Sequence, residues 1–365
     1  MNIIEIIDSK QINKPDIIIY KASKRKWDAI AKPLDSLGKF EEVVSRIAAI
    51  SGSDDVNIDS AILYVFASDN GVVDEGISQS GQEVTKICAE GIASGRHSVA
   101  VMAKKAGVDV QVVDVGINDK LHNDSKIEAF DAACGKILDK KVCMGTRNFA
   151  IKPAMTREEA ISAMKVGFEL VKNARDKGYK LICVGEMGIG NTTTSTAVAC
   201  SILGISPEDI TGRGAGLDDV RLDRKKKVIR EAITKYDLYN ADALTVLESV
   251  GGFDIAAMAG VYIGGAKYGV PVVMDGVISA VAALVSECLV PGTKEYIIPS
   301  HMSGEPVMRK ILEELSLSPV IDANMSLGEG TGAILMVELL QNVLEVYNHA
   351  ARFDERDIIP YEHLK

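Results

Sequence analysis

The chain has 365 residues, of which 47% are hydrophobic and 25% charged, values typical of a folded globular protein and not of a disordered one. Its formal net charge of −10 argues against nucleic acid or an anionic membrane surface as the main partner, since either would favour a basic surface. No run reaches the roughly 18 apolar residues needed to span a bilayer, and residues 1–10 lack a cleavable signal pattern, so we expect a cytoplasmic protein.

In chain order, the predicted elements begin with helices, continue with short apolar runs that alternate with helices, and end with one long amphipathic helix. The apolar runs are rich in β-branched residues, as strands are, and each ends at a turn. The predicted strands are 61–67, 108–115, 180–184, 270–274 and 296–299. The predicted helices are 37–50, 155–177, 219–235, 245–263 and 332–351.

The strands are mostly continuous apolar runs, which indicates a parallel sheet buried on both faces. We therefore expect an α/β fold: a Rossmann-like, mostly parallel sheet with helices on both faces. The helical ends are expected to pack together as a small helical domain. The predicted domains are residues 1–55 and 331–365, which share the small domain, and 56–330, the large catalytic domain; the tail from 353 is expected to be loose.

Polar, glycine-rich segments follow each predicted strand, and in open parallel sheets ligands bind beyond the carboxyl ends of the strands. The segment 185–195 (GEMGIGNTTTS) has glycines that allow backbone N–H groups to approach an anion, and it leads into a helix N-terminus. It is not a Walker A loop and is a poor dinucleotide fingerprint, which disfavours a dehydrogenase. The alternative is a tight strand-to-helix turn that binds nothing.

Two later segments are further candidates. The segment 212–229 joins a glycine cluster to a basic helix, most of which is expected to face solvent, while one lysine reaches a phosphate. In 326–333 (SLGEGTGA), Glu329 stands between two glycines just before the last helix. It is either a first-turn acid that complements the helix dipole or a carboxylate beside a ligand. The loop 71–85 either lines an acceptor pocket or is an ordinary surface loop.

Cysteine and histidine residues are scattered and form no metal-ligand spacing, so free thiols are expected and neither a metal nor a cofactor is predicted.

Ten segments together resemble the nicotinate-nucleotide:dimethylbenzimidazole phosphoribosyltransferase family, which makes the lower-ligand nucleotide of cobalamin. They occur in the family's order over some 300 residues, from KPLDSLGKFEE (32–42) and DNGVVDEGISQSGQEVT (69–85), through VVDVGI, GTRNFA, GEMGIGNTT, GRGAGLDD, VGGFDIAAMAG, VVMDGVIS and SHMSGEP, to LGEGTGA (327–333). The resemblance implies a Rossmann-like domain with a small helical domain, usually in a homodimer.

The resemblance also implies residue roles. The family's general base maps onto Glu329, and its second active-site glutamate maps onto Glu186. The nucleotide contacts map onto Gly188, Ile189, Gly190, Gly214, Lys225, Ser303 and Gly304. The substrates would be nicotinate mononucleotide and an aromatic base such as 5,6-dimethylbenzimidazole, and the products nicotinate and an α-ribazole 5′-phosphate type nucleotide.

The sequence departs from the family pattern where the acceptor is expected. Ser80 is followed by Gly81 where the family often has proline, and Cys88 lies where acceptor-lining residues are expected. Relatives that activate phenol or p-cresol work as pairs of paralogous subunits, and this chain could be one of them. The alternative that is not an enzyme is a non-catalytic, nucleotide-binding partner subunit.

Overall fold

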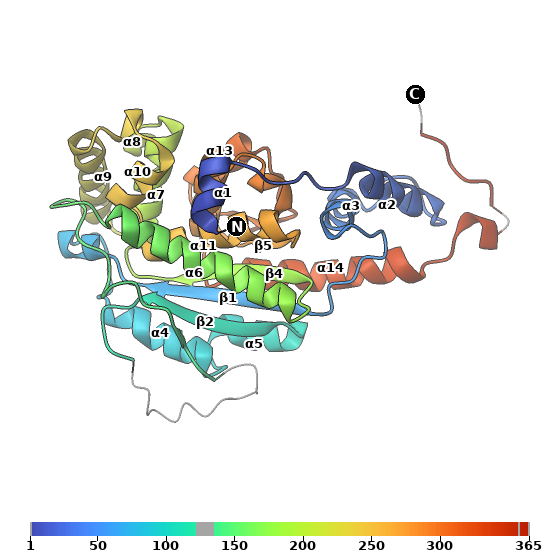
Figure 1. The fold of residues 1–365 in the computed structure, drawn as a ribbon, viewed down its shortest axis with the longest axis horizontal. Coiled ribbons are helices and arrows are strands. Elements are labelled where there is room, and N and C mark those ends of the chain that lie inside the picture. Colours follow the sequence, from blue (N-terminus) through green and yellow to red (C-terminus); the bar gives the residue numbers. More distant parts are fainter. Residues whose placement is uncertain (1, 122–134, 357, 364–365) are drawn as a thin grey trace.

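The structure is a computed structural model that describes residues 2–121, 135–356 and 358–363. At its centre is a six-stranded sheet with the order β3-β2-β1-β4-β5-β6, in which every neighbouring pair is parallel (Figure 1). The strands are β1 (Ala61–Ser68), β2 (Asp109–Gly116), β3 (Leu138–Asp139), β4 (Leu181–Met187), β5 (Val272–Met274) and β6 (Ile297–Pro299). The predicted fold class is confirmed, and the strand order reverses between β1 and β4.

Both faces of the sheet are covered, and β1 shows why its sequence reads as a continuous apolar run. All eight of its residues are buried. Ile62, Tyr64 and Phe66 belong to the hydrophobic cluster on one face. Leu63 and Val65 belong to the cluster on the other face. Alternating side chains of a strand point to opposite faces, so a strand buried on both needs apolar residues throughout.

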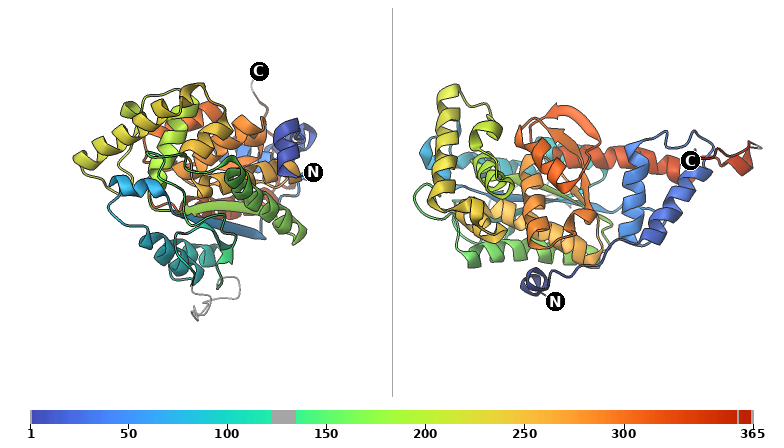
Figure 2. Two further views of the ribbon diagram at one scale, coloured as in Figure 1. Left: turned by 60° about the vertical axis from the view of Figure 1, so that its left-hand side comes forward. Right: turned by 90° about the horizontal axis from the view of Figure 1, so that it is seen from above.

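The helices lie in two layers. On one side of the sheet are α6 (Arg157–Asp176) and α11 (Phe253–Tyr268), and on the other are α4 (Glu83–Ala93) and α5 (Ser98–Ala106) (Figures 1 and 2). The first side also carries α1 (Ile3–Ser9), α7 (Asn191–Leu203), α10 (Ala243–Val250), α12 (Val277–Leu289) and α13 (Val307–Leu315).

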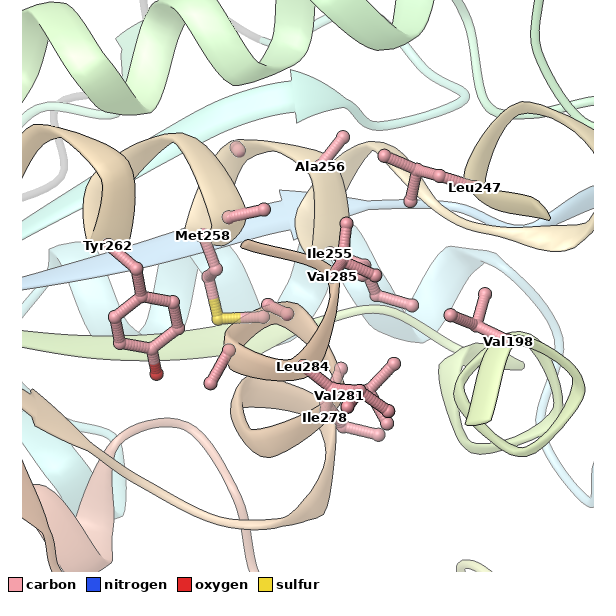
Figure 3. Packing of buried hydrophobic residues seen from close by; sticks show 14 of the residues in the cluster. Val198, Leu247, Ile255, Ala256, Met258, Tyr262, Ile278, Val281, Leu284 and Val285 are labelled. Atoms are coloured by element: carbon pink, nitrogen blue, oxygen red, sulfur yellow. The ribbon is translucent and has the colours of Figure 1, made fainter. Parts of the chain in front are cut away.

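Helix α11 is the centre of the first layer. Its residues from Phe253 to Ala266 are buried, which fits a helix that is hydrophobic all round and enclosed by protein. Figure 3 shows Ile255 of α11 close to Val285 of α12, and both belong to the same buried cluster. This packing fixes the N-terminus of α11, which matters for the cavity described below.

The predicted helix 245–263 is wrong in one respect: it is two helices, α10 and α11. Gly251 and Gly252 have extended backbone angles and separate them. The break places Asp254 in the first turn of a new helix. The predicted strand 180–184 is also too short, since β4 pairs with β1 as far as Met187 and therefore includes Glu186.

At one end of the molecule, α2 (Ile17–Ala29) and α3 (Lys39–Ser51) pack near the far end of α14 (Thr331–His349) (Figure 1). The Trp27 and Tyr347 rings lie 4.7 Å apart, and the Tyr347 hydroxyl donates to Ser23 Oγ at 2.9 Å. One hydrophobic cluster runs from these helices to the sheet. The division into domains at residues 55 and 330 stays a prediction.

The remaining elements lie outside the central sheet. A separate two-stranded parallel sheet consists of β7 (His301–Ser303) and β8 (Ile321–Met325), neither of which the apolar pattern predicted. The others are α8 (Pro207–Ile210), α9 (Asp219–Lys235) and the 3-10 turns η1 (Gly71–Glu75), η2 (Leu238–Asn240), η3 (Thr293–Tyr296) and η4 (Phe353–Glu355). None of the helices in the described ranges combines the length and apolar character that a membrane span requires.

Candidate active site

A cavity of about 240 Å³ lies beyond the carboxyl ends of the central strands. Its wall includes Gly188 just after β4, Asp275 just after β5 and His301 two residues after β6, so it lies at the edge of the sheet where open α/β folds bind ligands. A larger hollow of about 580 Å³ lies instead among residues 12–20, 42–49 and 291–295, away from these strand ends. The predicted carboxylates line the smaller cavity.

Glu329 reaches this cavity from a loop with an unusual backbone. Gly328, Glu329 and Gly330 have φ values of +81°, +63° and +93°, three successive residues in the left-handed region. Such a conformation costs a residue with a side chain about 1 kcal/mol or more, so the surrounding structure must hold it. A Cβ on Gly185 of β4 would lie 2.4 Å from the Glu329 carbonyl oxygen, so the loop packs directly on the strand. The Glu329 carboxylate is buried and contacts His97.

Asp275, which directly follows β5, holds this loop and the start of α14. Its Oδ2 accepts from the Gly330 N–H at 3.0 Å, and its Oδ1 accepts from the N–H groups of Gly332 at 2.7 Å and Ala333 at 3.2 Å. The first N–H groups of a helix have no partner within it, and a carboxylate there is favoured by the helix dipole. Asp275 is 2% exposed, so these bonds are shielded from water.

Glu186, at the end of β4, forms a buried acidic group with Asp254. The Asn191 side-chain amide donates to Glu186 Oε2, and to Asp254 Oδ2 at 3.1 Å. Burial, reinforced by the charge of Asp254, raises the pKa of Glu186 to about 8. Burial also raises the pKa of Asp254 to about 6. Glu186 is therefore mostly protonated at neutral pH, which lets it donate a hydrogen bond into the cavity.

This shift predicts a pH dependence of stability. Because the folded pKa of Glu186, about 8, exceeds its ordinary value of 4.5, the folded state binds this proton more tightly. Its contribution to stability is full below about pH 4.5 and is lost as pH rises through about 8. The measurement is urea unfolding of wild type and Glu186→Gln at pH 5 to 8. The free energy of unfolding of the variant minus that of wild type should rise with pH, by up to ~1.4 kcal/mol per pH unit. Parallel pH profiles for the two proteins would contradict this shift.

The cavity brings together most of the residues predicted from the sequence, and the following line it: Glu329, Glu186, Gly188, Ile189, Gly214, Ser303 and Cys88. Ser80 is an exposed loop residue whose N–H donates to Ser78 Oγ, and it does not line the cavity. Gly304 is exposed and donates its N–H to the Met325 carbonyl at 3.1 Å. The roles of all these residues stay predictions.

The loop after β4 requires glycines because neighbouring chain segments pack closely against it, which the sequence did not reveal. A Cβ on Gly188 would lie 2.4 Å from the Ser68 carbonyl oxygen at the end of β1. Gly190, the residue before α7, has a φ of +91°, and a Cβ there would lie 2.7 Å from Val73 Cγ2. Gly190→Val would therefore disturb the fold and does not isolate nucleotide binding, even if Gly190 also lies close to a ligand.

Lys225, on α9, is fully buried behind this wall. Its Nζ donates to Thr192 Oγ1 at 3.0 Å and to the Gly212 carbonyl at 3.1 Å, which uses two of its three hydrogens. Burial lowers the pKa of Lys225 to about 8. Thr192 and Glu305 line the cavity, and Glu305 Oε1 accepts from the Gly214 N–H at 3.0 Å. Lys225 thus lies one residue behind the cavity surface.

Several site residues were not predicted. Asn191, Asp254, Asp275 and His301 were within the motifs of the resemblance but received no role, and His97 was in none of them. Burial lowers the pKa of His301, whose Nδ1 lies 3.0 Å from Ser300 Oγ. The available sequence signal for Asp275 was an aspartate directly after the predicted strand 270–274.

Within the described ranges, no group of three or more His, Cys, Asp or Glu side chains is arranged to hold a metal ion.

Comparison with known proteins gives one consistent result. A phosphoribosyltransferase family model, DBI_PRT, matches residues 12–358. The chain is 40% identical over 341 residues to the nicotinate-nucleotide–dimethylbenzimidazole phosphoribosyltransferase of Clostridium perfringens, covering 93% of this chain and 91% of the relative. It is 39% identical over 358 residues to the enzyme of the same name from Clostridioides difficile, covering 98% and 99%. A crystal structure of CobT from Thermus thermophilus superposes with a TM-score of 0.86 at 34% identity, covering 94% of this chain and 100% of that one.

Proposed function

Because this chain belongs to the DBI_PRT phosphoribosyltransferase family, we propose that it transfers the phosphoribosyl group of nicotinate mononucleotide to 5,6-dimethylbenzimidazole or a similar aromatic base. The products are nicotinate and an α-ribazole 5′-phosphate type nucleotide. The observation that carries the proposal is one cavity lined by two glutamates in different surroundings: Glu329 lies beside His97, and burial raises the pKa of Glu186 to about 8.

The nucleotide half of the cavity is its glycine-rich side. We place the phosphate near the first turn of α7, where the positive end of the helix dipole favours an anion. Gly188, Ile189, Thr192 and Gly214 line this side. The remaining hydrogen of Lys225 lies directly behind Thr192, so an arriving phosphate would partner a buried cation.

The transfer needs one base. A ring nitrogen of the acceptor attacks C1′ from the face opposite nicotinate, and the bond between C1′ and the pyridinium nitrogen breaks with its electron pair. The configuration at C1′ inverts, and the other acceptor nitrogen gives its proton to a carboxylate. Glu186 holds its own proton at neutral pH and is a poor acceptor of another, so we assign the base to Glu329.

The acceptor side is formed by Cys88 of α4 together with Leu327 and Gly328 of the loop before α14. The relatives bear the dimethylbenzimidazole name, so a phenol acceptor and a non-catalytic subunit gain no support from them. The test is to incubate the pure protein with nicotinate mononucleotide and, separately, 5,6-dimethylbenzimidazole, benzimidazole, adenine, phenol and p-cresol. Mass spectrometry should detect the benzimidazole nucleotide and free nicotinate. Absence of any nucleotide product would refute the proposed transfer.

Lys225→Met tests the phosphate site, because methionine fills similar space without the charge. The KM for nicotinate mononucleotide should rise roughly 10- to 100-fold, as expected for loss of a charge-assisted hydrogen bond, while the KM of the base changes little. The melting temperature should not fall greatly, since the substitution removes a buried cation. Lys227→Met, on the same helix with an exposed side chain, is the matched control and should behave as wild type. An unchanged nucleotide KM in Lys225→Met would remove Lys225 from the phosphate site.

We also propose a dimeric assembly in the cytoplasm. Ile17 and Ile18 at the start of α2 are 60% and 71% exposed, an apolar pair of the kind that subunit contacts cover. Free thiols are typical of a reducing compartment, and the free cysteines in the described ranges are Cys88, Cys143, Cys183, Cys200 and Cys288.

A further inference from the structure

The Glu329 carboxylate is hydrogen-bonded to His97, a side chain that lies 232 positions away in the chain. The Nδ1 of His97 is 2.9 Å from Glu329 Oε2, and its side chain is 31% exposed, against 7% for Glu329. A Cβ on Gly91 of α4 would lie 3.0 Å from His97 Cδ2, so the imidazole ring packs closely on that helix. The ring is therefore held between α4 and the loop before α14.

The imidazole has no evident structural task. His97 is the residue before α5, yet its side chain makes no capping hydrogen bond to that helix. The contact with Glu329 involves Oε2 alone. The other oxygen, Oε1, is then the atom we assign to the acceptor's proton.

We propose that His97 is a positioning residue for the base. Its Nδ1–H donates to Glu329 Oε2, fixes the carboxylate on a left-handed stretch of backbone, and directs Oε1 to the acceptor. This inference rests on the proposed function, in which Glu329 removes the proton. His97 lies in none of the sequence motifs on which the resemblance rests.

The charge of the imidazole also matters for the reaction. With a neutral His97, the proton of the acceptor passes to Oε1 while the acceptor's other nitrogen forms its bond to C1′ and nicotinate departs with the electron pair. With a protonated His97, a full positive charge lies 2.9 Å from the carboxylate and stabilises its anionic form, so the base is weaker.

Other ionisable groups surround this pair. Cys88 faces it from α4, Glu186 from β4 and Asp275 from the end of β5, while Arg96 precedes His97 in the chain. Burial and the Glu329 charge raise the pKa of Cys88, and burial raises that of Glu186, so both are mostly protonated near pH 7. Asp275 is occupied as the acceptor of three N–H groups.

The experiment compares His97→Asn and His97→Ala as full-length proteins, with kcat measured from pH 5 to 9 at saturating nicotinate mononucleotide and 5,6-dimethylbenzimidazole. The asparagine Nδ2 occupies the place of the histidine Nδ1 and keeps a donor without titrating. His97→Asn should retain kcat within about threefold of wild type. His97→Ala should lose roughly tenfold or more at every pH, since a hydrogen bond to a charged group is lost. The nucleotide KM should not change in either variant.

His349→Asn is the matched control, because His349 is a 72%-exposed histidine near the far end of α14. It should leave kcat and its pH profile unchanged. Wild-type kcat in both His97 variants would overturn the inference. So would equal losses in the asparagine and alanine variants accompanied by a lower melting temperature, since that is the result for a purely structural residue. A fully active Glu329→Gln would instead refute the proposed base, and loss of activity in Glu329→Gln with normal His97 variants would refute the role of His97 alone.

Discussion

Glu329→Gln should lower kcat roughly 10²-fold or more, the usual effect of removing a positioned general base. Glutamine keeps the shape of the side chain and can still contact His97, so the loop and the nucleotide affinity should be preserved. The measurement is kcat with saturating nicotinate mononucleotide and 5,6-dimethylbenzimidazole, together with equilibrium binding of the nucleotide alone.

The matched control for this substitution lies on α14, the helix that follows the Glu329 loop. Glu345 is 78% exposed and 16 residues from Glu329, so Glu345→Gln should have wild-type kcat. A kcat within a few-fold of wild type for Glu329→Gln would exclude Glu329 as the base. Loss of nucleotide binding together with kcat would indicate a role in the fold instead of in proton transfer.

Asp275→Ala should have the largest effect on stability. It leaves the N–H groups of Gly330, Gly332 and Ala333 without their acceptor in a buried place. Each buried unsatisfied donor costs about 1–3 kcal/mol, so the free energy of unfolding should fall by ~3 kcal/mol or more. kcat should also fall, because the same bonds hold the loop that carries Glu329.

The control for this prediction is Asp242→Ala. Asp242 caps α10 through two N–H groups, those of Leu244 and Thr245, each at 3.0 Å, and it lies outside the cavity. Loss of this partly exposed cap should cost about 1 kcal/mol and leave kcat unchanged. Urea unfolding and kcat of the two variants give the comparison. Equal destabilisation by both substitutions would show that Asp275 is an ordinary helix cap. An unchanged kcat in Asp275→Ala would show that Asp275 does not position the loop with Glu329.

Much of the fold was predictable because apolar runs and helical periodicity are local signals. The strand 61–67 and the helix 219–235 were predicted to within one residue of β1 and α9. The errors have local causes as well. Gly251 and Gly252 interrupt an apolar stretch that otherwise continues from α10 into α11, and β8 is partly exposed and carries few of the apolar residues that identify a buried strand.

The glycines were harder to interpret than the strands. Gly185, Gly188 and Gly190 were predicted to let an anion approach, but each also has a backbone or side-chain neighbour that would collide with a Cβ. Chain packing and ligand approach both require glycine, so the residue type alone does not distinguish them. The partner of each glycine, such as the Glu329 carbonyl for Gly185, is distant in sequence and becomes known only from the fold.

The same reason explains why His97 was missed. A histidine in a scattered set carries no spacing signal, and its partner follows 232 residues later. The carboxylates were easier, since Glu329 and Glu186 lie in motifs where glycines concentrate. Sequence motifs therefore identified the acids, and the structure is needed to find the side chains that orient them.

Helix α14 connects the site to the other end of the molecule. Its 19 residues span about 28 Å at 1.5 Å per residue. The loop with Glu329 precedes its first turn, and Tyr347, near its last turn, packs on Trp27 of α2. The helices within residues 17–51 contribute no side chain to the cavity wall. They nevertheless pack on the far end of α14, the helix that follows the loop with Glu329. Deleting these helices would remove the contacts that hold the far end of α14. They therefore support the position of the Glu329 loop from a distance.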